Sequence, residues 1–242
     1  MEGIKNIMNF LYKTDLEECK EMAKNLLMQE VVQTDIPFVC NHPIIENPTY
    51  IIDNKLVNIF EDKKAYKKVI IDAERMIDNC NEFMELLELI RKPYRLIFVK
   101  FCKDYLTEKD FSEGLIDAFI NDEFANNNVN VPKAELIKLF KIAKRDYMMQ
   151  ENDKEEFNNF PNEITVYRGL TTFNSDNIKA LSWTLDENKA KWFATRFSQN
   201  GKVYKANINK KDVFAYINLR SEKEIILDYR KLENITFYYV EI

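Results

Sequence analysis

The sequence predicts an α+β protein in which a mostly helical region precedes a small antiparallel β-sheet. Apolar residues recur at helical spacing through most of residues 4–149, whereas short runs of β-branched and aromatic residues dominate after residue 163. A chain of 242 residues with 46% hydrophobic content is long enough to bury a substantial core. We therefore expect a helical region over residues 1–155 and a sheet-rich core over residues 160–242.

Within the helical region, two kinds of local pattern stand out. The runs Thr49–Ile52 and Leu56–Phe60 flank a turn signal and predict a small hairpin near residues 49–60. Pro132 suits the first turn of a helix that runs to about Met149. The charged, Asn-rich segment 150–162 is the best candidate for a linker or boundary. Apolar stripes predict further helices over residues 4–32, with a restart near Thr14-Asp15, and over 63–91, 93–106 and 109–126.

In the C-terminal core, one helix is expected among several strands. The helix spans about residues 186–198, and Thr184 with Glu187 three residues later matches a capping box at its start. Its buried face would carry Ala190, Phe193, Ala194 and Phe197. The strands are predicted near residues 164–168, 180–184, 202–208, 213–217, 223–228 and 235–241.

The charge of the chain is negative overall and unevenly distributed. The formal net charge is −5 at pH 7, which argues against a general nucleic-acid binder, because such proteins need a basic surface to pair with phosphates. Residues 163–242 carry 13 Lys and Arg against 10 Asp and Glu, a net charge of +3, whereas residues 1–162 carry 22 against 30, a net charge of −8. The C-terminal third is where we expect a phosphate-bearing ligand.

The remaining composition favours a cytoplasmic protein without metal. Four dispersed cysteines that lack Cys-x-x-Cys spacing indicate free thiols rather than a zinc site or a disulfide framework. The single histidine, His42, precedes Pro43 in a polar loop, so multi-histidine metal sites are excluded. The sequence begins without a basic segment followed by an apolar one, and no run approaches the roughly 18 apolar residues of a membrane span. We expect no membrane partner.

Two strand ends in the C-terminal core carry side chains that suit an anionic ligand. Arg168 precedes Gly169, so its planar guanidinium can bind a diphosphate where a glycine lets a ligand approach the backbone. Ser182 shares a strand face with Thr184, and Trp183 points to the other face. A serine beside a carboxylate can orient that carboxylate by hydrogen bonding. Ser182 lacks a visible base that would make it a nucleophile.

A third strand end carries two carboxylates. Glu222 and Glu224 stand two residues apart at the start of an apolar run, and residues i and i+2 of a strand share a face, so both should project side by side. Such a pair serves chemistry that passes through an oxocarbenium ion, because one carboxylate stabilises the developing positive charge and the other accepts a proton. Each motif alone is more often a salt bridge or a solvated strand end. Their combination carries the functional argument.

An aromatic-Arg-Gly strand end, a Ser-x-Thr strand before a helix and a Glu-x-Glu strand, in this order, resemble the Arg-Ser-Glu class of mono-ADP-ribosyltransferases, which includes arginine-directed toxins and exoenzymes. The resemblance covers about residues 160–242. It implies a small split antiparallel β-sheet core of the ADP-ribosyltransferase type, preceded by helices. It also implies NAD+ as the substrate and a toxin-like role in a bacterium or in a host cell infected by a phage.

The resemblance further implies a role for each matched residue. Arg168 would bind the phosphates of NAD+ and Gly169 would lie against the nicotinamide carboxamide, with Tyr167 and Thr184 completing the cofactor-binding set. Ser182 would position the catalytic carboxylate. The catalytic carboxylate would be Glu224, with Glu222 assisting the acceptor as in arginine-directed members, and the loop Tyr216–Ser221 would recognise the target.

Three functions remain open at this point. The first is transfer of ADP-ribose from NAD+ to a macromolecule, with a protein arginine favoured and a nucleic-acid acceptor not excluded. The second is an NAD+ glycohydrolase, which would use the same residues with water as the acceptor. The third is a non-catalytic phage or bacterial interaction protein with a degenerate core. It is favoured by Ser182-Trp183-Thr184 in place of the family's Ser-Thr-Ser and by the short separation of 14 positions from Arg168 to Ser182.

The aromatic residues in and after the Ser182-Trp183-Thr184 motif have two interpretations. They would either line a nicotinamide pocket or, as their spacing favours, belong to the core. These residues are Trp183, Trp192, Phe193 and Phe197.

Overall fold

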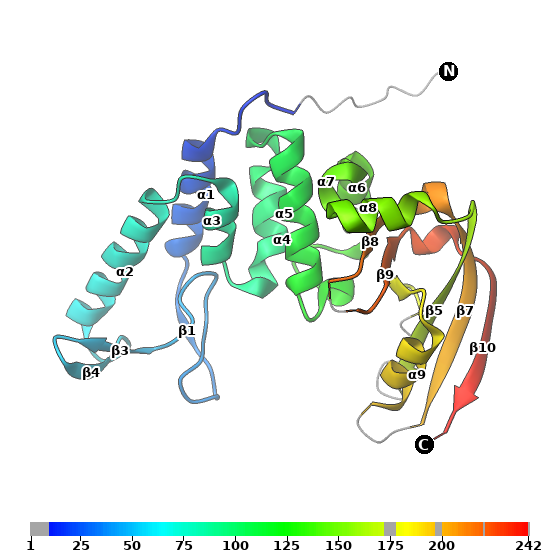
Figure 1. Ribbon diagram of the computed structural model, residues 1–242. Coiled ribbons are helices and arrows are strands. Elements are labelled where there is room, and N and C mark those ends of the chain that lie inside the picture. Colours follow the sequence, from blue (N-terminus) through cyan, green and yellow to red (C-terminus); the bar gives the residue numbers. More distant parts are fainter. Residues whose placement is uncertain (1–9, 172–177, 197–199, 220, 242) are drawn as a thin grey trace. The chain divides into compact units, whose positions relative to one another are not determined.

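The computed structural model describes residues 10–171, 178–196, 200–219 and 221–241 (Figure 1). Contacts divide the chain into two compact units, Met1–Val131 and Pro132–Ile242. Helices predominate in the first unit, and the second combines helices with a six-stranded antiparallel sheet, so the predicted α+β class is confirmed. Within the described ranges, none of the helices has both the length and the apolar character that a membrane crossing requires.

The first unit joins helices to two small antiparallel pairs of strands. Asp15 caps its first helix by accepting a hydrogen bond from the backbone N–H of Glu18 at 3.3 Å, which confirms the predicted restart near Thr14-Asp15. Residues 4–9 of the segment predicted as helical over 4–32 lie outside the described residues, and the rest of that prediction is too long, because residues 10–15 and 28–32 are not helical. The elements are α1 (Leu16–Leu27), β1 (Val32–Gln33), β2 (Cys40–Asn41), β3 (Thr49–Ile52), β4 (Lys55–Asn58), α2 (Lys63–Asp78), α3 (Phe83–Leu89), α4 (Lys92–Cys102) and α5 (Glu108–Asn121).

The hairpin predicted near residues 49–60 is confirmed. Strands β3 and β4 pair in antiparallel register, and Asp53 and Asn54 between them have φ of 50° and 61°. Both residues therefore occupy the left-handed region, which Asn and Asp tolerate better than most residues and which a tight two-residue hairpin turn requires.

The prediction of a single helix over residues 63–91 is wrong in one respect, because this apolar stripe forms two helices. Helix α2 ends at Asp78, and α3 begins at Phe83. Asn81 lies between them, and its backbone N–H donates to the Glu85 carboxylate at 2.7 Å. Short polar side chains and such side-chain contacts compete with helical backbone hydrogen bonds and break the helix here. The apolar periodicity continues across the break and therefore does not reveal it.

His42 and the four cysteines are buried in the protein interior. His42 is 1% exposed rather than in a solvated loop: its Nδ1 accepts hydrogen bonds from the backbone N–H groups of Ile44 and Ile45, and its Nε2 bonds to the carbonyl of Leu27. Burial lowers the pKa of His42, so the neutral imidazole is favoured. All four cysteines are free and buried.

The second unit contains the six-stranded sheet, in the order β10-β7-β5-β6-β9-β8 with every pairing antiparallel. Among the described residues, one pair, Tyr167 opposite Thr184, joins β5 to β6, whereas nine pairs join β5 to β7. The sheet therefore consists of two three-stranded halves that meet at a single point. The strands are β5 (Glu163–Thr171), β6 (Ser182–Thr184), β7 (Gly201–Asn209), β8 (Val213–Ile217), β9 (Glu224–Leu227) and β10 (Glu233–Val240).

Three helices before the sheet pack against its β8 edge. The rings of Phe140 and Phe214 stack with centroids 5.4 Å apart, and Arg145 donates to the carbonyl of Val213. These contacts explain why the contact boundary falls between Val131 and Pro132, earlier in the chain than the composition of residues 150–162 suggested. The helices are α6 (Lys133–Ile142), α7 (Arg145–Met148) and α8 (Glu151–Asn158).

Two predictions for this segment are corrected by these helices. The helix predicted from Pro132 to about Met149 ends at Ile142, because Ala143 is extended with ψ of 147°. The segment predicted as a linker is helical over most of its length. Phe157 of α8 is buried, which gives this polar sequence one apolar anchor in the core.

Helix α9 (Glu187–Thr195) lies directly on β5 and β7 (Figure 1). Small residues permit this approach: Ala190 and Ala194 are fully buried on the helix, and Gly169 and Gly201 face them from the strands. A Cβ atom added to Gly169 would lie 1.9 Å from the carbonyl oxygen of Ala190. Gly169 is thus required by the packing of α9.

Replacing Gly169 with alanine is expected to destabilise the second unit. The clashing atoms belong to the backbone of α9, so no side-chain rotation relieves the overlap, and overpacking of this kind costs about 1–3 kcal/mol of unfolding free energy. Denaturant unfolding of Gly169→Ala measures the loss, with exposed Lys205→Ala on β7 as the control. An unfolding free energy equal to that of wild type would contradict this account of the packing.

Candidate functional site

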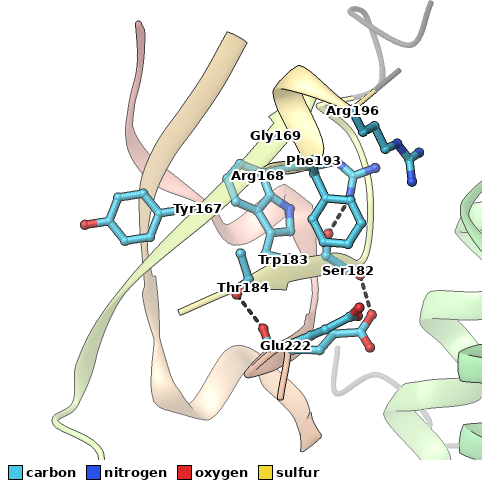
Figure 2. A pocket seen from close by; sticks show the side chains of 10 residues that line it. Tyr167, Arg168, Gly169, Ser182, Trp183, Thr184, Phe193, Arg196 and Glu222 are labelled. Carbon is cyan, nitrogen blue, oxygen red and sulfur yellow. Dashed lines mark hydrogen bonds between the residues drawn. The ribbon is translucent and has the colours of Figure 1, made fainter. Parts of the chain in front are cut away.

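A cavity of about 140 Å³ opens where β5 and β6 diverge beyond their single shared pair. It is shown in Figure 2. Side chains from both halves of the sheet and from α9 surround it. The lining residues are Tyr167, Arg168, Gly169, Ser182, Trp183, Thr184, Phe193, Arg196, Glu222 and Glu224.

Arg168 links the two halves of the sheet at the cavity. It lies on β5 opposite Tyr204 of β7, and its Nη1 donates to the carbonyl oxygen of Ser182 on β6 at 2.5 Å (Figure 2). Burial lowers the pKa of Arg168 to about 10, the negative charge of Glu224 opposes this shift, and the positive charge of Arg196 adds to it. The guanidinium therefore remains cationic at neutral pH.

Ser182 and Glu224 meet across neighbouring strands. In the β6–β9 register, Thr184 lies opposite Glu224 and Ser182 lies opposite Ile226, so Ser182 and Glu224 are diagonal neighbours on one face. The Ser182 hydroxyl donates a hydrogen bond to Oε1 of Glu224. This is the contact expected of a serine that orients a carboxylate. It fixes the direction of Oε1 of Glu224.

Glu222 lies outside the strand, so the prediction that both glutamates project side by side from a strand is wrong. Strand β9 begins at Glu224, and the residues on either side of Glu222 have left-handed backbones, with φ of 52° at Ser221 and 45° at Lys223. Both glutamates nevertheless line the cavity. A turn rather than strand alternation brings Glu222 there.

Thr184 does not cap helix α9, contrary to the capping-box prediction. Asp186 is the N-cap, and its carboxylate accepts hydrogen bonds from the backbone N–H groups of Asn188 at 2.8 Å and Lys189 at 3.2 Å. The Thr184 hydroxyl instead donates to the carbonyl oxygen of Glu222 at 2.6 Å and accepts from the N–H of Asp186 at 3.0 Å. Its hydroxyl is engaged by the main chain rather than directed at a ligand.

Arg196 is a cavity residue that the sequence analysis did not select. It follows the last turn of α9, and its guanidinium carbon lies 5.3 Å from the ring centre of Phe193, which also lines the cavity. The two residues are three positions apart, and that spacing on a helix makes them neighbours. A Phe-x-x-Arg pattern at the end of a helix predicted beside the site was the available signal.

The aromatic residues named from the sequence have different environments. Trp183 is 2% exposed and donates its Nε1–H to the carbonyl of Ala180 at 3.0 Å, as a core residue would. Trp192 is 57% exposed. Phe193 is half-buried at the cavity, and Phe197 lies outside the described residues.

Two further expectations are modified by the packing. Tyr167 lines the cavity, but its ring packs against the buried cluster of Ala190, Ala194 and Val203. The expected target loop Tyr216–Ser221 is shorter, because Tyr216 is fully buried in strand β8 and Ile217 ends that strand. Residue 220 of the loop lies outside the described residues.

No protein-family model, no curated protein and no solved structure matches this chain. Among the side chains that the structure describes, no group of three or more His, Cys, Asp or Glu residues is placed to hold a metal ion.

Proposed function

We propose that this protein transfers ADP-ribose from NAD+ to a macromolecular acceptor, with release of nicotinamide. The observation that carries the proposal is the hydrogen bond from Ser182 to Glu224 beside the cation Arg168, in the lining of a small cavity. A directed carboxylate and a cation at one cavity match the two charges of the substrate, a positively charged nicotinamide ribosyl group and a negatively charged diphosphate.

The size of the cavity supports a single aromatic ring as its occupant. Its volume is about 140 Å³, and an apolar cavity of about 150 Å³ is enough to hold a benzene molecule. The nicotinamide ring would therefore enter the cavity, with the ring of Phe193 available for stacking. The diphosphate would remain at the rim, where Arg168 and Arg196 supply two guanidinium groups with the fork geometry that phosphates prefer.

The carboxylates would act on the bond between ribose C1′ and the nicotinamide nitrogen. As this bond breaks, its electron pair leaves with nicotinamide and positive charge develops on the ribosyl ring. Glu224, directed by Ser182, would stabilise that charge. The acceptor nitrogen then forms the new bond to C1′, and its proton passes to the Glu222 carboxylate.

The acceptor that these groups suit best is a guanidinium of a protein arginine. Glu222 and Glu224 both line the cavity, so a cationic acceptor would meet negative charge where it must lose a proton. Water would replace the acceptor in an NAD+ glycohydrolase without any change in the roles of Arg168, Ser182 and Glu224.

The test is incubation of the protein with NAD+ labelled in its adenylate half, in the presence of a cell lysate. Nicotinamide release together with label on a macromolecule is the expected result. Release without label would assign a glycohydrolase. If no nicotinamide is released and calorimetry detects no binding of millimolar NAD+, the proposal fails and a non-catalytic interaction protein is the better interpretation.

A further inference from the structure

The turn that carries Glu222 has an unfavourable backbone conformation. Ser221 and Lys223 flank Glu222 with φ of 52° and 45°, and neither is glycine. Side chains with a Cβ atom disfavour this left-handed region, so two such residues around one carboxylate persist only where other contacts hold them. Unusual backbone of this kind concentrates at functional sites.

The contacts that hold the turn come mainly from the strand end at Thr184. The Thr184 hydroxyl donates to the carbonyl of Glu222 at 2.6 Å, and the N–H of Leu185 donates to the carbonyl of Lys223 at 3.0 Å. From the other side, the N–H of Lys223 donates to the Asn218 side-chain oxygen at 3.3 Å. Two consecutive carbonyls of the turn are thus fixed to residues 184 and 185.

Thr184 itself is held in place by three features. It is 7% exposed, it lies opposite Glu224 in the β6–β9 register, and its hydroxyl accepts the N–H of Asp186, the N-cap of α9. The same strand end, at Thr184, therefore fixes the turn that carries Glu222 and pairs with Glu224. Without the Thr184 hydroxyl, the carbonyl of Glu222 would lose its partner and the turn could relax.

We infer that Thr184 is a positioning residue that determines whether the ribosyl group passes to an acceptor nitrogen or to water. This inference rests on the proposed function. Removal of a proton from an acceptor requires a carboxylate within hydrogen-bond reach of one nitrogen, whereas water enters in many orientations. Departure of nicotinamide depends on Glu224 and not on the turn. Loosening the turn should therefore reduce transfer more than nicotinamide release.

The experiment compares two products with agmatine, a small guanidine compound, as the acceptor probe. Thr184→Val keeps the shape of the side chain and removes the hydroxyl, and Thr184→Ser keeps the hydroxyl. The ratio of ADP-ribosyl-agmatine to free ADP-ribose is expected to fall about tenfold in Thr184→Val and to recover in Thr184→Ser, because small misplacements of a reacting group have effects of this size. Thr236→Val on the exposed β10 strand is the matched control.

A second variant covers the case in which Thr184→Val does not fold. Glycine adopts left-handed φ without strain, so Lys223→Gly should fold as well as wild type while allowing the turn other conformations. The product ratio should fall in this variant too. An unchanged ratio in the folded variants, with wild type transferring to agmatine, would overturn the inference and leave the proposed function standing. No nicotinamide release from wild type would instead reject the proposed function and, with it, the inference.

Discussion

Replacing Glu224 with glutamine is expected to reduce the rate of nicotinamide release from NAD+ by about 10²–10³-fold. Glutamine has the shape of glutamate and its side-chain oxygen can still accept the hydrogen bond from Ser182, so the geometry of the β6–β9 strand pair should survive. What disappears is the negative charge beside the ribosyl group. Because that charge matters most when positive charge develops, kcat should fall while the KM for NAD+ changes little.

Two comparisons make this expectation specific. Glu233→Gln, at an exposed position on β10, makes the same chemical change away from the cavity and should leave nicotinamide release unaltered. Glu222→Gln should retain most of the release and lose transfer to an acceptor. Equal release by wild type and Glu224→Gln would exclude Glu224 as the group that stabilises the transition state.

Much of the second unit is predictable from its sequence because strand alternation is a local signal. The run 213–217 forms a strand with the predicted bounds, and the polar residues expected at three strand ends gather at one cavity. This succeeds for Arg168 and Ser182 because their side-chain directions follow from strand periodicity alone.

The parts that could not be predicted depend on choices that the local sequence leaves open. Thr184 and Asp186 are both good N-caps two residues apart, and the contact of Thr184 with the Glu222 turn, distant in sequence, selects Asp186. Left-handed backbone at Ser221 and Lys223 has no signal, because neither residue type favours it. Glu222 therefore reaches the cavity by tertiary contacts rather than by the alternation that suggested it.

Replacing Arg168 with lysine is expected to raise the KM for NAD+ by about 10- to 100-fold, since hydrogen bonds to charged groups contribute about 1.5–3 kcal/mol. Lysine keeps the positive charge but not the planar fork. In wild type, Nη1 donates to the carbonyl of Ser182 at one end of the planar fork, and a phosphate is bound best by two parallel N–H groups of such a fork. The ammonium group of lysine donates from one nitrogen and cannot bind a phosphate through two parallel N–H groups. Steady-state kinetics of nicotinamide release measure the change, with exposed Arg75→Lys as the control.

The pH dependence of NAD+ binding tests the same assignment without a mutation. Burial lowers the pKa of Arg168 to about 10, so the guanidinium is protonated at neutral pH and loses its proton as the pH rises through 10. The affinity for NAD+ should accordingly hold between pH 7 and about 9 and weaken above that, because a neutral guanidine no longer attracts the diphosphate. An affinity for NAD+ that does not weaken above pH 9, or a KM for NAD+ in Arg168→Lys equal to that of wild type, would place the diphosphate elsewhere.

Substitutions of Arg196 test whether one diphosphate contacts both arginines, because Arg196 and Arg168 line the same cavity. If both groups bind one diphosphate, each single substitution to lysine removes part of a shared interaction, and the double variant should weaken NAD+ binding by a factor different from the product of the two single effects. If the effects simply multiply, the two arginines act on separate parts of the ligand. The double-mutant cycle thus converts their common position at the cavity into a measured coupling.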